Sequence, residues 1–123
     1  MPNSNKVHVL SKDNAPHFKW GQDCDGWWLK NEGQFTVIYE IMPAGSFEIK
    51  HYHQNTEQFF YCLQGQLLIE FEDFEQSLHE HEGISIKAGI THQVKNNSQN
   101  SICFLVISSP NLPEDRVNLD SQR

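Results

Sequence analysis

The feature that most constrains the fold is a succession of short segments rich in β-branched and aromatic residues, which begins at Phe35. Gly, Pro, Asn and Asp turn signals separate these segments at intervals of about ten residues, a spacing typical of a β-sandwich or barrel. Helix signals are nearly absent from this region. The predicted strands are residues 35–41, 47–53, 58–63, 66–71, 76–79, 84–87, 92–96 and 102–107. The sequence therefore predicts an all-β domain.

Two kinds of strand can be distinguished by their hydrophobic pattern. In residues 66–72, Leu67, Ile69 and Phe71 alternate with mostly polar residues, which indicates a strand with one buried face. Residues 59–63 and 102–107 are apolar throughout, so both of their faces should be covered. A partner subunit or the N-terminal segment could provide the cover, and we predict a homodimer.

The regions on either side of this β-rich stretch have a different character. Residues 1–34 contain Trp20, Trp27 and Trp28 among small and acidic residues, and we interpret them as an N-terminal strand followed by an irregular aromatic arm. The arm could be a lid over a barrel mouth, but we expect it to pack on the barrel or on a second subunit. Residues 110–123 should form an extended surface tail. Residues 35–109 are thus predicted to be the barrel.

Composition excludes several classes of partner. The chain has 123 residues, enough for one domain, and 16 acidic against 9 scattered basic residues. Nucleic acid and anionic membranes are therefore unexpected partners, and no segment approaches the about 20 apolar residues of a membrane span. Three cysteines without metal-ligand spacing, and a start without the apolar run of a signal peptide, favour a cytoplasmic location.

Histidines supply the candidate chemistry. In a strand, residues two apart project from the same face with Cα atoms about 6.5–7 Å apart, so His51 and His53 can converge on one metal ion. A later strand begins with His92, which offers a third imidazole if the sheet curls. His79 and His81 form a second spaced pair, but they lie among acidic residues at a turn without a third ligand. We interpret this second pair as surface residues.

The context of His51 and His53 resembles the cupin superfamily. Its first motif, G-x5-H-x-H-x(3 or 4)-E-x6-G, is matched by Gly45, His51, His53 and Gly65, with Gln58 at the glutamate position. The later half of its second motif, G-x5-P-x-G-x2-H-x3-N, is matched by the residues Gly89, His92 and Asn96. The opening of the second motif is altered, because Lys87 replaces its proline and Gly83 lies two residues too close.

The resemblance implies a double-stranded β-helix, or jelly-roll barrel, that holds one divalent metal ion, with Fe, Mn, Ni and Zn all compatible. It extends to a subgroup of small bacterial cupins with a Trp-Gly-x-x-Cys-Asp-Gly-Trp arm, here residues 20–27. Their tail has the pattern Phe-Leu-Val-Ile-Ser-x-Pro followed by Asp-Arg, here residues 104–110 with Asp115 and Arg116. This subgroup has no agreed activity, so the resemblance implies a fold and a metal more than a reaction.

The identity of a fourth ligand is open. The motif spacing selects Gln58, whereas Glu57 is the obvious carboxylate competitor. Adjacent strand residues face opposite sides, so only one of them can reach the ion unless a bulge intervenes. We predict metal ligation by His51, His53, His92 and Gln58, and a site of three histidines alone is the remaining possibility.

Function is less constrained than fold, because cupins catalyse many reactions and some catalyse none. We expect a metalloenzyme that acts on a small anionic organic substrate inside the barrel, as an oxygenase, isomerase or cyclase. The alternative is a non-catalytic cupin that binds or senses a small molecule, and a purely structural metal site is the third possibility. No catalytic residue can be assigned, because the orientations of Tyr39, Glu40, Tyr61 and Cys62 are open. Cys62 could face the cavity or fill the core, and we favour the core.

Overall fold

The computed structural model describes residues 7–119, and all regular secondary structure in that range is β-strand. The all-β prediction is therefore confirmed. The described residues also contain no helix long and apolar enough to cross a membrane. The strands are β1 His17–Trp20, β2 Cys24–Glu32, β3 Phe35–Met42, β4 His51–His53, β5 Glu57–Gln64, β6 Leu67–Glu70, β7 Glu75–Leu78, β8 Gly83–Ile86, β9 Gln93–Lys95, β10 Ile102–Ser109 and β11 Arg116–Asn118.

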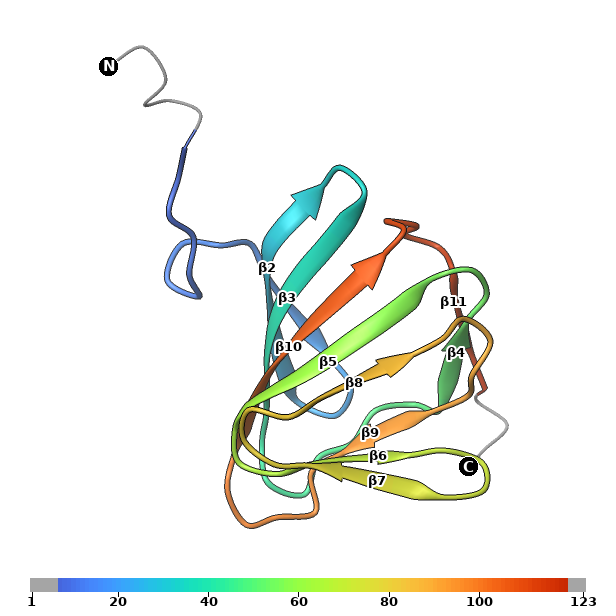
Figure 1. Ribbon diagram of the computed structural model, residues 1–123. Helices are drawn as coiled ribbons and strands as arrows, with labels where there is room; N and C mark the ends of the chain where they lie inside the picture. Colours follow the sequence, from blue (N-terminus) through green and yellow to red (C-terminus); the bar gives the residue numbers. More distant parts are fainter. Residues whose placement is uncertain (1–6, 120–123) are drawn as a thin grey trace.

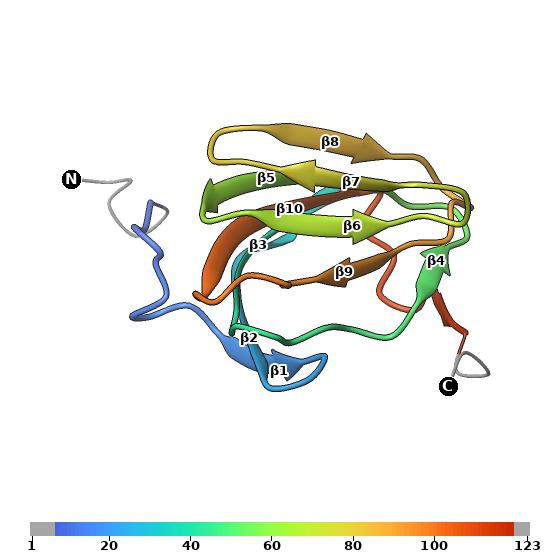
Figure 2. The ribbon, with the colours of Figure 1, turned by 90° about the horizontal axis from the view of Figure 1, so that it is seen from below.

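The strands form two facing layers (Figures 1 and 2). The larger layer is a six-stranded sheet in the order β1-β2-β3-β10-β5-β8, and all of its neighbouring strands pair antiparallel. The smaller layer combines the sheet β7-β6-β9 with the pair β11-β4. Isolated bridges from Phe47 to Lys95 and from His51 to His92 join these two parts. The β4 segment thereby lies beside β9 across from the large sheet.

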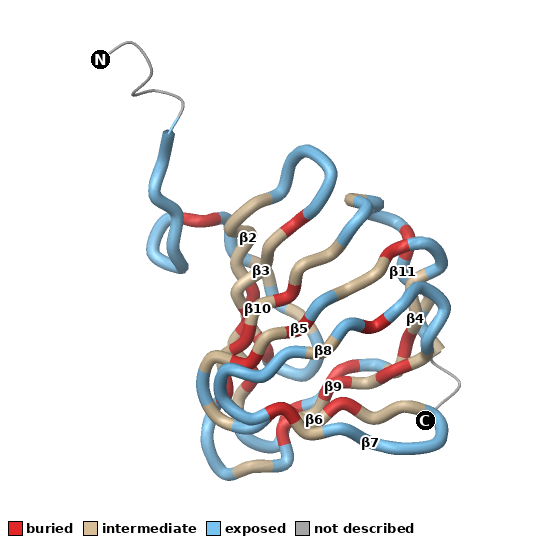
Figure 3. The backbone as a smooth tube through the Cα atoms, viewed as in Figure 1, coloured by how far each residue is buried: buried red, intermediate tan, exposed pale blue. Residues whose placement is uncertain are grey.

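The core lies between the layers, mainly at the end of the barrel near the β5–β6 turn (Figure 3). Its largest fully buried apolar side chains are those of Met42, Leu67, Ile69, Ile102 and Phe104. Leu67 and Ile69 alternate with half-buried neighbours, which confirms the prediction for that strand. A cavity lies toward the other end of the barrel, where Thr56, Ser108 and Pro110 are among its lining residues.

The N-terminal arm is regular, which corrects the expectation of an irregular segment. Residues 17–20 and 24–32 form a hairpin, β1-β2, that extends the large sheet by pairing with β3. The three-residue turn between them is compact because Gly21 and Asp23 adopt positive φ angles of 53° and 62°. The expected N-terminal strand is absent from residues 7–10, and residues 1–6 lie outside the described range.

Residues of the Trp-Gly-x-x-Cys-Asp-Gly-Trp arm have structural roles in this hairpin. The Trp20 Nε1 donates a hydrogen bond to the Asp25 carbonyl over 2.9 Å, and Cys24 is buried in the core. Phe18 pairs with Gly26, and a Cβ at position 26 would lie 2.4 Å from the Phe18 ring. Only glycine therefore lets the Phe18 ring lie against β2.

The C-terminal segment is extended, but part of it is a strand that the sequence did not reveal. β11 pairs antiparallel with β4, so that Arg116 lies opposite His53 and Asn118 opposite His51. Asp115 anchors this segment, because its carboxylate accepts hydrogen bonds from the backbone N–H groups of Asn55 and Thr56 at 2.7 and 2.8 Å. The predicted strand 47–53 is correspondingly shorter, with only residues 51–53 in β4.

The outer face of the large sheet is apolar and only partly covered within this chain. On the central strand β10, Leu105 pairs with Tyr39 on one side and Tyr61 on the other, and all three are half-buried. The neighbouring Phe59 is exposed. β5 and β10 therefore have one buried and one half-covered face, and the N-terminal hairpin extends the sheet edge rather than covering this face.

Candidate metal centre

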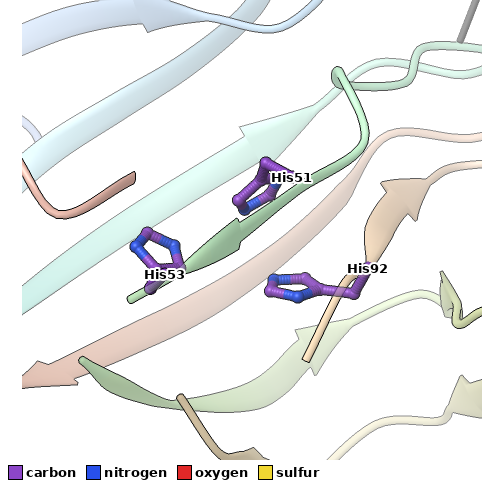
Figure 4. Close-up of side chains that lie close together, drawn as sticks. All are labelled: His51, His53 and His92. Atoms are coloured by element: carbon purple, nitrogen blue, oxygen red, sulfur yellow. The ribbon is translucent and has the colours of Figure 1, made fainter. Parts of the chain in front are cut away.

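Three histidines from two segments of the smaller layer converge at one point (Figure 4). His51 and His53 project from the same face of β4, as the two-residue spacing predicts. His92 directly precedes β9 and is placed by a reciprocal backbone pair, in which the His51 and His92 N–H groups donate to each other's carbonyls at 3.0 and 2.8 Å. The backbone register therefore fixes the position of all three residues.

The geometry of the cluster suits a shared metal ion. One potential ligand atom from each of the three rings lies within 4.8 Å of the others, and His51 and His92 are only 2% and 1% exposed. Metal–imidazole bonds of about 2.0–2.1 Å put two ligands of one ion at most about 4.2 Å apart, so coordination requires only a small contraction.

Backbone carbonyls set the protonation of two of these rings. The Nδ1 of His51 lies 2.9 Å from the Ile49 carbonyl, and the Nδ1 of His92 lies 2.9 Å from the Ile90 carbonyl. A carbonyl can only accept, so each Nδ1 carries the proton and each Nε2 keeps a free lone pair. Carbonyls that orient ligand histidines in this way are common around metal sites.

Buried polar atoms without hydrogen-bond partners occur at the same cluster. Among the described residues, the buried side-chain nitrogen and oxygen atoms without a hydrogen-bond partner are the Nε2 of His53, the Nε2 of His92 and the Oε1 of Gln58. Leaving such atoms unsatisfied costs about 1–3 kcal/mol each. All three belong to predicted ligands, and each can offer a lone pair, so the donor set fits a divalent transition metal.

Gln58 and its competitor Glu57 face different surroundings. The Gln58 Nε2 donates to the Ser108 hydroxyl over 3.0 Å, and its side chain lines the cavity together with those of His51 and His53. The Glu57 side chain is 46% exposed and lies 3.7 Å from the Lys87 ammonium group. Strand alternation therefore directs Gln58 inward and Glu57 toward solvent.

Burial keeps the histidines neutral. It lowers the pKa of His51 to about 2, with further lowering from the charges of Arg116 and His92. Burial and the His92 and Arg116 charges lower the pKa of His53 to about 4, while nearby Asp115 and Gln58 oppose the shift. The pKa of His92 is also lowered, chiefly by burial. Neutral imidazole is the form that binds metals.

Two of the histidines, His51 and His53, line a cavity of about 230 Å³ between the layers. Its wall combines apolar and polar side chains, and the N-terminal hairpin contributes the aromatic side chains of Phe18, Trp20 and Trp28. The arm thus neither forms a separate lid nor packs only on the outside of the barrel. A small organic molecule of this size would lie with one end near the histidines.

Three charged side chains that sequence reasoning did not assign line this cavity: Glu40, Glu48 and Arg116. The Arg116 Nη2 lies 3.5 Å from the Glu48 Oε1, and the Glu48 Oε2 accepts a hydrogen bond from the Val94 N–H over 3.1 Å. Burial raises the pKa of Glu48 to about 7, although Arg116 and Val94 oppose it. The sequence named Glu40 with its orientation open, and it placed Arg116 in the tail motif of the subgroup without a role in the site.

The remaining sequence candidates lie elsewhere. His79 and His81 are exposed at the turn after β7, and among the described residues they belong to no cluster of three potential metal ligands. His8 and His17 are exposed as well. Cys62 is fully buried in the hydrophobic core, in agreement with the favoured interpretation, whereas Tyr39 and Tyr61 lie on the outer sheet face.

Comparison with known proteins agrees with this architecture. The Cupin_2 family, described as a cupin domain, matches residues 37–108. Quercetin 2,3-dioxygenase of Bacillus subtilis (strain 168) is 30% identical over 67 residues. That match covers 54% of this chain and only 20% of the dioxygenase, so the chain corresponds to a small part of that relative.

Solved structures share the fold at low sequence identity. The polyketide cyclase RemF from Streptomyces resistomycificus superposes with a TM-score of 0.79 at 15% identity, covering 92% of this chain and 85% of the cyclase. A predicted oxalate decarboxylase from Thermotoga maritima gives a TM-score of 0.76 at 13% identity, covering 84% and 99%. These likenesses establish the double-stranded β-helix fold.

Proposed function

Because this chain belongs to the Cupin_2 family, we propose that it is a metal-dependent enzyme that binds one small anionic organic substrate in its barrel cavity. The observation that carries the proposal is the set of unpartnered buried atoms on His53, His92 and Gln58 beside that cavity. If these residues served only for packing, the fold would leave three buried polar groups without hydrogen bonds, which native proteins rarely do.

The proposed ligands of a single divalent ion are His51, His53, His92 and Gln58. Ser108 orients the Gln58 amide from β10, and the carbonyls of Ile49 and Ile90 orient two imidazoles. When bound, such an ion supplies Lewis-acid polarisation of a coordinated oxygen and, if it is redox-active, reaction with O2. The side chains of Phe18, Trp20 and Trp28 would exclude water from the substrate.

Two features support an anionic substrate. The proposed ligands are all neutral, so they leave the 2+ charge of the ion uncompensated. Arg116 adds a permanent positive charge to the cavity wall, although Glu48 offsets part of it. A carboxylate, enolate or phenolate oxygen is therefore the chemistry that this cavity would favour.

Metal analysis of protein purified without an affinity tag tests the centre. We expect about one divalent ion per chain in the wild type and its loss in His51→Ala and His92→Ala, with circular dichroism showing that the fold is retained. His79→Ala and His81→Ala are matched controls, because they remove histidines with the same spacing at an exposed turn. Equal metal content in the wild type and both site variants would refute the assignment.

The reaction can then be sought with the loaded protein. The partial similarity to quercetin 2,3-dioxygenase makes O2 consumption with flavonols the first assay, followed by 2-oxo acids under aerobic and anaerobic conditions. Mass spectrometry of any co-purified molecule narrows the choice. Tight binding of such acids without turnover of any of them would favour the alternative, a cupin that binds or senses a small molecule.

A further inference from the structure

Glu40 is a buried carboxyl group in the cavity wall that the metal centre does not use. It lies on β3, in the large sheet, whereas the histidines belong to the smaller layer. Its side chain is 9% exposed, and it faces inward together with the neighbouring inward residues Ile38 and Met42. Its cross-strand partners are Gly26 and Phe104, which offer its carboxyl group no polar side chain.

The Glu40 carboxyl lacks a protein partner. No hydrogen bond or ion pair among the described residues involves it, whereas the other buried cavity carboxyl, that of Glu48, contacts the Val94 N–H and the Arg116 guanidinium. The Glu40 oxygens are not among the fully enclosed unpartnered atoms, so they border the cavity, where water or a ligand can satisfy them. Contacts within the fold therefore satisfy the Glu48 carboxylate, whereas none among the described residues satisfies the carboxyl group of Glu40.

The charge state of Glu40 bears on what it could bind. Burial and the nearby Glu48 charge raise its pKa well above the usual value, and the charge of Arg116 opposes this only in part. A carboxyl group kept neutral in an apolar site can donate a hydrogen bond as well as accept one.

We infer that Glu40 is a ligand-contacting residue, which hydrogen-bonds to an oxygen on the part of the bound molecule that points away from the histidines. The inference rests on the proposed function, and it narrows the substrate class. The molecule has a metal-chelating oxyanion at one end and a hydroxyl or carbonyl oxygen at the other. Between them lies an apolar body that contacts the aromatic wall formed by Phe18, Trp20 and Trp28.

Matched probes can isolate this contact. Hydroxybenzoates chelate metals through their carboxylate and 2-hydroxyl oxygens, and 2,4-dihydroxybenzoate differs from 2-hydroxy-4-methylbenzoate only by a hydroxyl in place of a methyl group. In a second pair, 2,5-dihydroxybenzoate and 2-hydroxy-5-methylbenzoate, the hydroxyl and methyl groups are compared at ring position 5. Titration calorimetry on protein of measured, equal metal content gives the preference for hydroxyl over methyl.

The wild type should bind at least one dihydroxybenzoate about tenfold more tightly than its methyl counterpart. Glu40→Leu should abolish this preference while changing the affinity for the methyl probe little, because the lost hydrogen bond involves only the hydroxyl. Glu40→Gln should retain most of the preference, since a carboxamide also donates and accepts. Glu75→Gln, an exposed position on β7, serves as the control.

Different results would overturn the proposed function and the role of Glu40. Absence of metal from the wild type overturns the proposed function. A loaded wild type that binds neither probe pair, or that shows no preference for hydroxyl, overturns the inference alone. An equal loss of affinity for both members of a pair in Glu40→Leu also overturns it, because that result indicates only a change in cavity shape.

Discussion

At the scale of single residues, the unusual feature of the candidate centre is the amide of Gln58 where the related motif has a carboxylate. Its position next to Ser108 on β10 directs the amide into the cavity, and its Oε1 has no partner. A neutral ligand makes the centre more positive than a site with glutamate would be. Gln58 therefore gives the most direct way to alter the charge of the site.

We predict that Gln58→Glu tightens metal binding and weakens an anionic ligand. The added carboxylate attracts the ion and repels the ligand anion, and in a partly buried site each effect should be about tenfold or more. Competition with a metal chelator measures the first effect. Calorimetric titration of 2-oxo acids at equal metal occupancy measures the second. If the variant binds these acids as tightly as the wild type, the charge of the metal-binding side chains does not select the ligand.

The sequence placed the histidines but not the acidic side chains around them. His51, His53 and His92 could be predicted because a two-residue spacing fixes their common face and a motif relates them to a distant strand. Glu40 could not be assigned, because both faces of its strand are apolar: Ile38 and Met42 face inward while Tyr39 and Ile41 face outward. When both faces are apolar, alternation alone does not reveal which of them lines a cavity.

At the scale of elements, the strands missed by the sequence reasoning are those whose pairing depends on distant residues. β1 and β2 contain Trp and Gly residues without alternation, and they are held in the sheet by β3. β11 has three residues and is a strand only because it pairs with β4. From residue 35 to residue 109, by contrast, alternation and turn signals predicted every strand of the structure to within a few residues, apart from the shortened 47–53.

Asp115 should couple the C-terminal segment to the metal centre. Its carboxylate joins β11 to the loop that follows β4, the strand that carries His51 and His53. We predict that Asp115→Ala lowers the thermal midpoint of the protein and weakens metal binding about tenfold, as expected for a residue that supports ligands from outside the coordination sphere.

Thermal unfolding of the metal-free protein and metal titration of the folded protein measure these two effects. Asp73→Ala, at an exposed position in the β6–β7 turn, is the control and should change neither quantity appreciably. A thermal midpoint and a metal affinity equal to those of the wild type would show that β11 does not support the site.

At the scale of the whole molecule, the outer face of the large sheet is an apolar surface that this chain leaves only partly covered. Leu105, Tyr39 and Tyr61 lie side by side near its centre. Contiguous apolar surface of this kind usually marks an interface. We therefore predict a homodimer formed through this face, with twofold symmetry that pairs the same surface of each subunit.

Light scattering at micromolar concentration tests the homodimer. The wild type should give twice the chain mass of 14.3 kDa, and Leu105→Lys should give the monomer mass while retaining bound metal, because Leu105 faces away from the cavity. Phe74→Lys, an exposed aromatic position outside this face, should leave the dimer intact. A wild type of monomer mass at this concentration refutes the prediction.

The position of β10 in the large sheet has a consequence for how the protein is made. β10 lies between β3 and β5, which do not pair with each other, although its residues follow theirs by about 40 positions or more. During synthesis, the edges of β3 and β5 that pair with β10 therefore stay unpaired until residue 109 has left the ribosome. Sheets closed by such distant pairing form slowly and expose aggregation-prone edges in the meantime. The barrel can therefore close only after nearly the whole described chain has been synthesised.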